Sequence, residues 1–97
     1  MMTIKKIIKF LLYKIMFFGE KVYIKNNCSI SMRSKLLAKN GEIYLDENVW
    51  IGGGATVLDG IIIKKGCVIG AGSVVTKNTE EYGIYVGNPA RKIGNRE

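Results

Sequence analysis

The sequence predicts an all-β fold, a parallel β-helix of about three coils that is preceded by an amphipathic α-helix. Two patterns predict the coils: branched aliphatic residues recur at every sixth position in the middle of the chain, and glycine or asparagine recurs three residues after each. A third pattern, lysines and long aliphatic residues with helical spacing, marks the N-terminal segment. The 97 residues are 47% hydrophobic and 24% charged, so we expect one globular domain.

Residues 1–21 form the first predicted segment, a basic amphipathic helix. Within it, residues 4–18 read IKKIIKFLLYKIMFF, with Lys5, Lys6 and Lys9 on one side of a helix and most aliphatic residues on the other. This stretch is too short and too charged for a bilayer span, which needs about 20 apolar residues. No small-residue cleavage site follows Phe18, which argues against a signal peptide. The helix therefore either packs on the β-helix or a neighbouring subunit, or lies on a membrane surface.

Basic side chains are concentrated in the N-terminal part of the chain. Residues 1–39 contain nine basic residues and one acid, within a formal net charge of +7. Such a segment predicts an anionic partner. The basic residues alternate with aliphatic rather than base-stacking aromatic residues, so we expect no nucleic acid and favour peripheral membrane contact through residues 4–18. Two cysteines, expected to be reduced, favour a cytoplasmic location, with membrane-peripheral as the alternative.

A six-residue repeat governs the predicted β-helix, residues 22–79. Each hexad has one branched aliphatic position and, three residues later, a corner position that holds glycine or asparagine, the residue types that most readily adopt a positive φ. The aliphatic positions are Leu45, Ile51, Val57, Ile63, Ile69 and Val75. The corner positions are Asn48, Gly54, Gly60, Gly66, Gly72 and Asn78.

A period of six indicates a short strand followed by a tight corner in each hexad. The corner residue avoids a Cβ clash, and the aliphatic side chain points inward. Three hexads close one triangular coil, and stacked coils form a parallel β-helix. An isolated amphipathic strand would instead repeat every two residues and a helix about every 3.6, and neither places glycine at every sixth position.

The repeat continues more weakly upstream, through Ile24, Ile30 and Leu36. From Leu36 to Leu45 the spacing is nine residues, so the register slips by three. This slip predicts either a loop that protrudes at residues 39–41 or a place where coils are missing relative to a longer ancestor. The remaining segment, residues 80–97, is a C-terminal tail that we expect to cover an open end of the stack.

The chain contains no histidine, which excludes several kinds of site. Neither Ser-His-Asp nor Cys-His catalysis is available, and no histidine-based zinc site can form. Cys28 and Cys67 are too few for a tetrahedral cysteine site or a disulfide framework. We therefore expect no bound metal.

Three segments occur in order in the second half of the chain: VWIGGGA at residues 49–55, VIGAGSVVTK at 68–77 and GNPARKI at 87–93. Together they closely resemble the hexapeptide-repeat acyltransferases, nearest to the maltose, galactoside and capsular-sugar O-acetyltransferases. The resemblance implies a left-handed β-helix that assembles as a homotrimer. It also implies acetyl-CoA as co-substrate, in a groove between neighbouring subunits, and a sugar-type or antibiotic hydroxyl as acceptor.

The same resemblance implies the residues of the site. Trp50 would flank the acyl end of the groove. Hydrogen bonds to the pantetheine arm would come from the backbone around Gly52, Gly53, Ala71 and Gly72, since glycine allows close approach to the backbone. Cationic and hydroxyl side chains pair with phosphate, and those around the CoA phosphates would be Thr76, Lys77, Arg91 and Lys92.

The base that deprotonates the acceptor in these relatives is a histidine N-terminal to the V-W-I-G stretch, which this chain lacks. The catalytic residues are therefore unknown, and we interpret the chain as a truncated relative that keeps the CoA-binding half. A carboxylate base is the alternative, from Glu42, Asp46, Glu47 or Asp59. Two functions stay open: an acetyl-CoA-dependent O-acyltransferase acting on a sugar-like hydroxyl, or a catalytically silent β-helix protein that binds CoA or serves as a structural or partner subunit.

Overall fold

The computed structural model describes residues 16–18 and 21–96, which form a left-handed parallel β-helix. The predicted fold class is thereby confirmed. The strands are β1 (Met16–Phe18), β2 (Val22–Ile24), β3 (Ser29–Ile30), β4 (Lys35–Leu37), β5 (Ile43–Leu45), β6 (Trp50–Ile51), β7 (Thr56–Val57), β8 (Ile62–Ile63), β9 (Val68–Ile69), β10 (Val74–Val75), β11 (Gly83–Gly87) and β12 (Ala90–Asn95).

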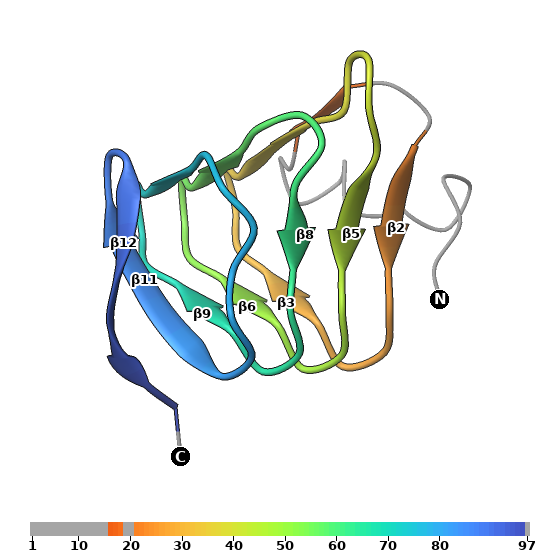
Figure 1. The fold of residues 1–97 in the computed structure, drawn as a ribbon. Coiled ribbons are helices and arrows are strands. Elements are labelled where there is room, and N and C mark those ends of the chain that lie inside the picture. Colours follow the sequence, from red (N-terminus) through yellow and green to blue (C-terminus); the bar gives the residue numbers. More distant parts are fainter. Residues whose placement is uncertain (1–15, 19–20, 97) are drawn as a thin grey trace.

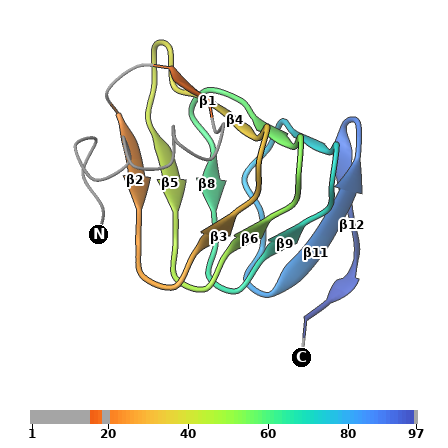
Figure 2. The same cartoon turned by 180° about the vertical axis from the view of Figure 1, so that it is seen from behind.

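Three sheets form the faces of a triangular prism (Figure 1). Sheet A has the order β2-β5-β8, sheet B the order β1-β4-β7-β10, and sheet C the order β12-β11-β9-β6-β3. Within each sheet the coils pair in parallel, and only β12 runs antiparallel to its neighbour β11. Viewed from behind, β2 and β3 lie at one end of the stack and the hairpin β11–β12 at the other (Figure 2).

The register shows that the coils are continuous where the six-residue repeat slips. Leu45 pairs with Ile63, three hexads later, whereas Leu36 pairs with Val57, which is three residues further than three hexads. The extra residues form a loop between β4 and β5 that projects beyond the prism (Figure 1). Of the two alternatives for the slip, the structure therefore has the protruding loop, and β4 stacks directly on β7.

The core is the predicted column of aliphatic side chains. All six aliphatic positions of the repeat, from Leu45 to Val75, are at most 2% exposed. The residue two positions before each of these aliphatic residues is also buried, including Ala55 and Cys67, which are 0% exposed. Truncating one of the larger core residues to alanine therefore leaves a cavity, at a cost of about 2–5 kcal/mol.

Five of the six predicted corner residues have a positive φ, between 60° for Asn48 and 76° for Gly60. Asn78 is the exception: it is not among the residues with positive φ, and its side-chain oxygen instead accepts a hydrogen bond from Ile62 N at 2.8 Å. The expectation for Asn78 was therefore wrong. Its side chain supplies the hydrogen-bond acceptor that a further strand would otherwise offer to Ile62 N. Positive φ also occurs at Arg33 and Tyr82, which the repeat did not predict.

The expected N-terminal helix is corrected at its C-terminal end. Met16–Phe18 form β1, which pairs in parallel with β4, Phe17 opposite Leu36. A strand here extends sheet B by one coil, since pairing with β4 satisfies backbone groups that would otherwise be an open edge. Residues 1–15, which carry the rest of the predicted helix, lie outside the described residues.

The C-terminal segment adds a hairpin to sheet C. β11 pairs with β9, Ile84 opposite Val68, and β12 returns alongside it. Arg96 then joins the hairpin to the coils: its backbone N donates to Tyr82 O at 2.6 Å and its guanidinium to Asn48 O at 2.8 Å. Among the described residues, no helix is long and apolar enough to cross a membrane.

Candidate functional site

The four backbone positions expected to hold pantetheine lie together at one corner. Sheet C leads to sheet B through residues 31–34, 52–55 and 70–73, which we call the glycine corner. Its coils are joined by hydrogen bonds from Gly54 N to Met32 O at 3.1 Å and from Gly72 N to Gly53 O at 2.9 Å. The structure therefore brings Gly52, Gly53, Ala71 and Gly72 together at one corner.

Close packing at this corner requires glycine at position 52. A Cβ on Gly52 would lie 2.6 Å from Ala71 N, which is backbone and cannot yield. A Cβ on Gly53 would have only ordinary contact, with Met32 O at 3.5 Å. The glycine at 52 thus serves packing between coils, and the one at 53 is exposed.

The outer side of the glycine corner offers open backbone groups. Gly52 N donates to Ile69 O and Gly72 N to Gly53 O, so these two amides are occupied. The amides of Gly53 and Ala71 donate to no described residue. A Cβ on Gly54 or Gly72 would meet nothing within 4 Å, so there is open space beside these two residues. An extended ligand can therefore approach the backbone here.

Trp50 lies on the outer face of sheet C, two residues before Gly52. Its side chain is 48% exposed, and its neighbours in register are Ser29 on β3 and Val68 on β9. Val68 in turn lies opposite Ile84 on β11. The indole is thus part of a largely apolar row that crosses the coils of sheet C, half-buried at Val68 and Ile84.

Thr76 and Lys77 are exposed but lie at a different corner, where sheet B leads towards sheet A. The strand β10 separates them from the glycine corner. One chain therefore does not gather all the predicted site residues in one place, which is consistent with a groove that two subunits complete.

Arg91 and Lys92 lie on the edge strand β12, both exposed. The Lys92 ammonium pairs with Glu80 Oε1 at 2.6 Å. This hydrogen bond and the attraction of the opposite charges lower the pKa of Glu80 and raise that of Lys92. Lys92 is therefore already partnered, whereas Arg91 has no ion pair among the described residues.

Three of the four carboxylates considered as bases, Glu42, Asp46 and Asp59, have structural partners elsewhere. Asp59 accepts Asn40 N at 2.7 Å and Gly41 N at 2.8 Å, which lowers its pKa and holds the protruding loop. Glu42 accepts the Tyr44 hydroxyl at 2.9 Å. The pKa of Asp46 is lowered, first by the hydrogen bond from Glu47 N. No described carboxylate belongs to the glycine corner.

Sequence reasoning identified Trp50 but not the apolar surface around it. Besides Trp50, the large exposed hydrophobic residues on sheet C or the glycine corner are Met32, Val86 and Ile93. They do not share one sequence period, since Met32 is at a corner and Val86 and Ile93 are in the hairpin. The pairing of β11 with β9 and of β12 with β11 adds Val86 and Ile93 to the sheet that bears Trp50.

Comparison with known proteins identifies the repeat. Residues 43–77 match the family model described as bacterial transferase hexapeptide (six repeats). The chain is 42% identical over 74 residues to chloramphenicol acetyltransferase from Klebsiella aerogenes, covering 76% of this chain and 35% of that protein. It is 38% identical over 86 residues to galactoside O-acetyltransferase from Lactococcus lactis subsp. lactis (strain IL1403), covering 82% of this chain and 42% of that protein.

Among solved structures, the fold is similar to a variant of AntD, an N-acyltransferase from Bacillus cereus in complex with dTDP-4-amino-4,6-dideoxyglucose and coenzyme A. The TM-score is 0.82 at 23% identity, covering 86% of this chain and 57% of that one. At this identity the likeness shows the fold alone. The chain spans less than half the length of the two curated relatives named above.

Proposed function

The chain belongs to the hexapeptide-repeat transferases, and from this we propose that it binds acetyl-CoA and acts in the O-acetylation of a sugar-like hydroxyl. The observation that carries the proposal is the glycine corner, where two backbone amides without described partners lie in an exposed stretch of chain near an exposed tryptophan. Amide donors of this kind suit the amide oxygens of a pantetheine arm.

The amides of Gly53 and Ala71 would hold the pantetheine arm, one coil apart. Successive coils are about 4.8 Å apart, so the arm would run along the stack rather than across it. Trp50 would then cover the thioester end. Similarity to a galactoside O-acetyltransferase and a chloramphenicol acetyltransferase supports an acetyl donor and a hydroxyl acceptor. The coenzyme A bound to the structurally similar AntD supports the choice of donor.

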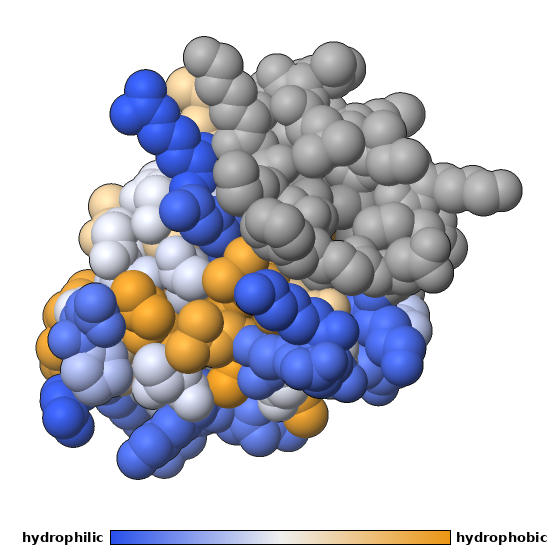
Figure 3. Space-filling model, turned by 90° about the horizontal axis from the view of Figure 1, so that it is seen from above, coloured by the Kyte–Doolittle hydropathy of each residue, from blue (hydrophilic) through white to orange (hydrophobic). Residues whose placement is uncertain are grey.

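A homotrimer would complete the groove. The predicted phosphate ligands Thr76 and Lys77 are at another corner from Gly53 and Ala71, so a neighbouring copy is needed to bring the two groups to one ligand. Exposed apolar side chains on sheet C, Trp50 and Ile93 among them, suit burial between copies. On the face seen from above, hydrophobic surface also lies between hydrophilic groups (Figure 3).

Acetyl transfer requires the acceptor hydroxyl to lose a proton as its oxygen attacks the thioester carbon, and the departing thiolate to gain one. The chain has no histidine for this step. Asp59 is a poor base because its two backbone hydrogen bonds stabilise the ionised form. The second candidate function, a protein that binds CoA without transferring the acetyl group, is favoured by this same observation.

Calorimetry of the purified chain with CoA and acetyl-CoA tests the binding step. We expect saturable binding that weakens with Arg91→Gln, because Arg91 is an exposed cation without an ion pair in the described residues. Lys35→Gln, the same charge change on sheet B, is the matched control. No saturable heat with either ligand would remove the proposal.

A transfer assay separates the two candidate functions. Thiol release from acetyl-CoA is followed with a panel of sugars and with the chain at the concentration where it assembles. Release that depends on the sugar supports the transferase, and binding without release supports the silent protein. Sedimentation at the same concentrations tests the homotrimer.

Residues 4–15 carry a separate proposal, peripheral contact of a cytoplasmic protein with an anionic membrane surface; packing against the fold or a neighbouring copy is the alternative. The lysines there attract anionic lipid headgroups and the aliphatic residues suit the interface. Replacing Lys5, Lys6 and Lys9 with glutamate is expected to abolish co-sedimentation with vesicles that contain phosphatidylserine. Unchanged co-sedimentation would count against membrane contact.

A further inference from the structure

The outer face of sheet A carries two parallel rows of side chains. In register across the three coils, the first row is Tyr23, Tyr44 and Ile62. The residues that follow each strand by one position give the second row, Lys25, Asp46 and Lys64. Sheet A is a different face from the one that bears Trp50, and its residues were not among those expected to bind CoA.

The first row leans away from the second. The rings of Tyr23 and Tyr44 stack with centroids 4.9 Å apart and an interplanar angle of 17°. Glu42 lies beyond them: its carboxylate accepts the Tyr44 hydroxyl at 2.9 Å and the Tyr23 hydroxyl at 3.5 Å. The hydrogen bond to Glu42 raises the pKa of Tyr44, so the phenol stays protonated and the ring is held in place.

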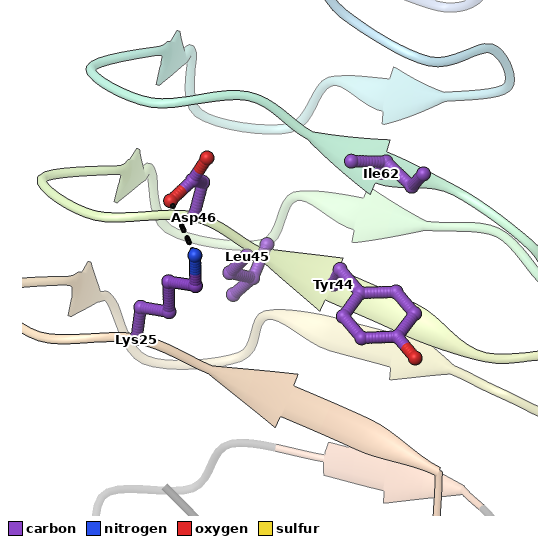
Figure 4. A pocket seen from close by; sticks show the side chains of 5 residues that line it. All are labelled: Lys25, Tyr44, Leu45, Asp46 and Ile62. Atoms are coloured by element: carbon purple, nitrogen blue, oxygen red, sulfur yellow. Dashed lines mark ion pairs between the residues drawn. The ribbon is translucent and has the colours of Figure 1, made fainter. Parts of the chain in front are cut away.

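The space between the rows is a pocket of about 250 Å³. Tyr44 and Ile62 give it apolar walls, and Lys25 and Asp46 lie along the opposite side. Leu45 also lines it, although its side chain is buried in the core. In Figure 4 the Tyr44 hydroxyl points away from the Lys25–Asp46 pair, with Leu45 between them. The pocket thus has an apolar half and a charged half.

The charged half is an ion pair in which both groups can still form further hydrogen bonds. Lys25 Nζ and Asp46 Oδ1 are 3.4 Å apart, longer than the 2.7–2.9 Å of a strong charge-assisted hydrogen bond. An ammonium has three donors, and Lys25 has no other described partner. Asp46 Oδ1 also accepts Glu47 N, whereas its Oδ2 accepts from no described residue.

We propose that this pocket binds a free hydrophobic α-amino acid, with its side chain against Tyr44 and Ile62, its carboxylate on Lys25 and its ammonium on Asp46. Charge complementarity selects this class. A cation and an anion side by side match the zwitterion of an amino acid, whose charges then alternate with those of the protein. A ligand with a single charge would satisfy one partner and be repelled by the other, and a sugar would leave the apolar walls poorly used.

The probes for the test are L-phenylalanine and three analogues that each lack one group. Phenethylamine lacks the carboxylate, 3-phenylpropionate lacks the ammonium, and glycine lacks the ring. Binding is followed by the amide NMR signals of the full chain. We expect phenylalanine to shift the signals of residues 44–46 and 62–63 with a dissociation constant of about 1 mM, within the range open to a ligand of this size. The analogues are expected to bind at least several-fold more weakly.

Two variants assign the charges. Lys25→Gln is expected to weaken phenylalanine binding on the order of tenfold, the usual effect of losing one charge-assisted hydrogen bond. It should strengthen phenethylamine binding, because the cation that repels the ammonium of this probe is removed. Asp46→Asn retains an acceptor for Glu47 N. It is expected to weaken phenylalanine binding and to strengthen 3-phenylpropionate binding, because the anion that repels the carboxylate of this probe is removed. Lys35→Gln, on sheet B, is the control and should change neither.

Three results would overturn the assignment. They are the absence of saturable shifts with phenylalanine, shifts that map outside sheet A, and equal binding of phenylalanine and its single-charge analogues. None of these results bears on CoA binding at the glycine corner, which the calorimetry tests separately.

Discussion

The ring of Tyr82 lies directly over Gly66, so that a Cβ at position 66 would overlap the ring carbons Cδ1 and Cε1. Both residues are at successive turns of one corner, and both have a positive φ, 73° for Gly66 and 59° for Tyr82. Tyr82 N also donates to Lys65 O at 2.8 Å, which fixes the ring over the glycine. Glycine at 66 therefore meets two requirements, a left-handed backbone and room for an aromatic ring.

Gly66→Ala is expected to destabilise the protein by about 3 kcal/mol, from the positive φ and the overlap with Tyr82 together. Gly54→Ala is the matched control, because Gly54 has a φ of 70° and nothing lies within 4 Å of the position that its new methyl group would take. It should cost only about 1–2 kcal/mol, the backbone contribution alone. Chemical unfolding at one fixed protein concentration measures both. In a Tyr82→Ala background, the cost of Gly66→Ala should fall to that of Gly54→Ala; equal costs in the two backgrounds would contradict the overlap.

Gly52→Ala is expected to distort the glycine corner, since its methyl group would press on Ala71 N at 2.6 Å. We expect a loss of about 1–3 kcal/mol in stability and weaker CoA binding. Gly53→Ala should be nearly neutral for stability because its methyl group has only ordinary contacts. Unfolding and calorimetry on the same samples compare them. Similar losses for the two variants would mean that the coils are not packed at Gly52 as described.

The hydrogen bonds of Asp59 lead us to expect that the stability of the protruding loop depends on pH. Two backbone hydrogen bonds, from Asn40 and Gly41, hold the pKa of its carboxyl below the usual value. A pKa that is lower in the folded state stabilises the fold above the unfolded pKa of about 3.9, and this contribution is lost as the pH falls through the folded value. We expect the amides of Asn40 and Gly41 to exchange faster with solvent in Asp59→Ala at pH 6. The difference between the wild type and the variant should shrink as the pH is lowered through the folded pKa of Asp59, and a difference that does not change with pH would contradict the assignment.

Arg96 fastens the end of the hairpin to the corner below it. Its guanidinium donates to Asn48 O at 2.8 Å, across an otherwise exposed surface. Arg96→Gln should lower stability by only about 1 kcal/mol, because one hydrogen bond is lost at the surface. Hydrogen exchange should be faster in β12 and unchanged in β5. The strand β5 is in sheet A, whereas the hairpin is in sheet C. Equal acceleration in both strands would indicate a global effect instead.

The repeating part of the fold could be predicted because the residue types within each hexad determine its inward position and its corner. From Leu45 to Val75, the inward aliphatic residue and the corner glycine or asparagine follow from sequence alone, and both are observed. Where a side chain replaces backbone, the pattern misleads: Asn78 occupies a corner position in the sequence but acts as an acceptor for Ile62 N. Met16–Phe18 likewise have a helical pattern, yet pairing with β4 determines their structure.

The site was predictable only in part, for a related reason. Gly52, Gly53, Ala71 and Gly72 converge because hexads three apart stack, so spacing in sequence becomes contact in space. The partner of Lys92 is Glu80, twelve residues earlier, and the hairpin that brings them together has no hexad spacing. The pocket on sheet A depends on the direction in which Tyr44 leans, which is set by Glu42 and not by the repeat.

The side chains of Asn78 and Thr79, which cover the edge of sheet A at β8, also determine whether a further strand can add there. Ile62 N donates to the Asn78 side chain, Ile62 O accepts Thr79 N, and Lys64 N donates to Thr79 Oγ1 at 2.9 Å. Each backbone group through which β8 would recruit another strand is thereby occupied by a residue of its own chain. A strand of another chain therefore has no free backbone group of β8 to pair with at this edge. On this one of the three faces, Asn78 and Thr79 block the end-to-end stacking of coils that could lead to fibrils.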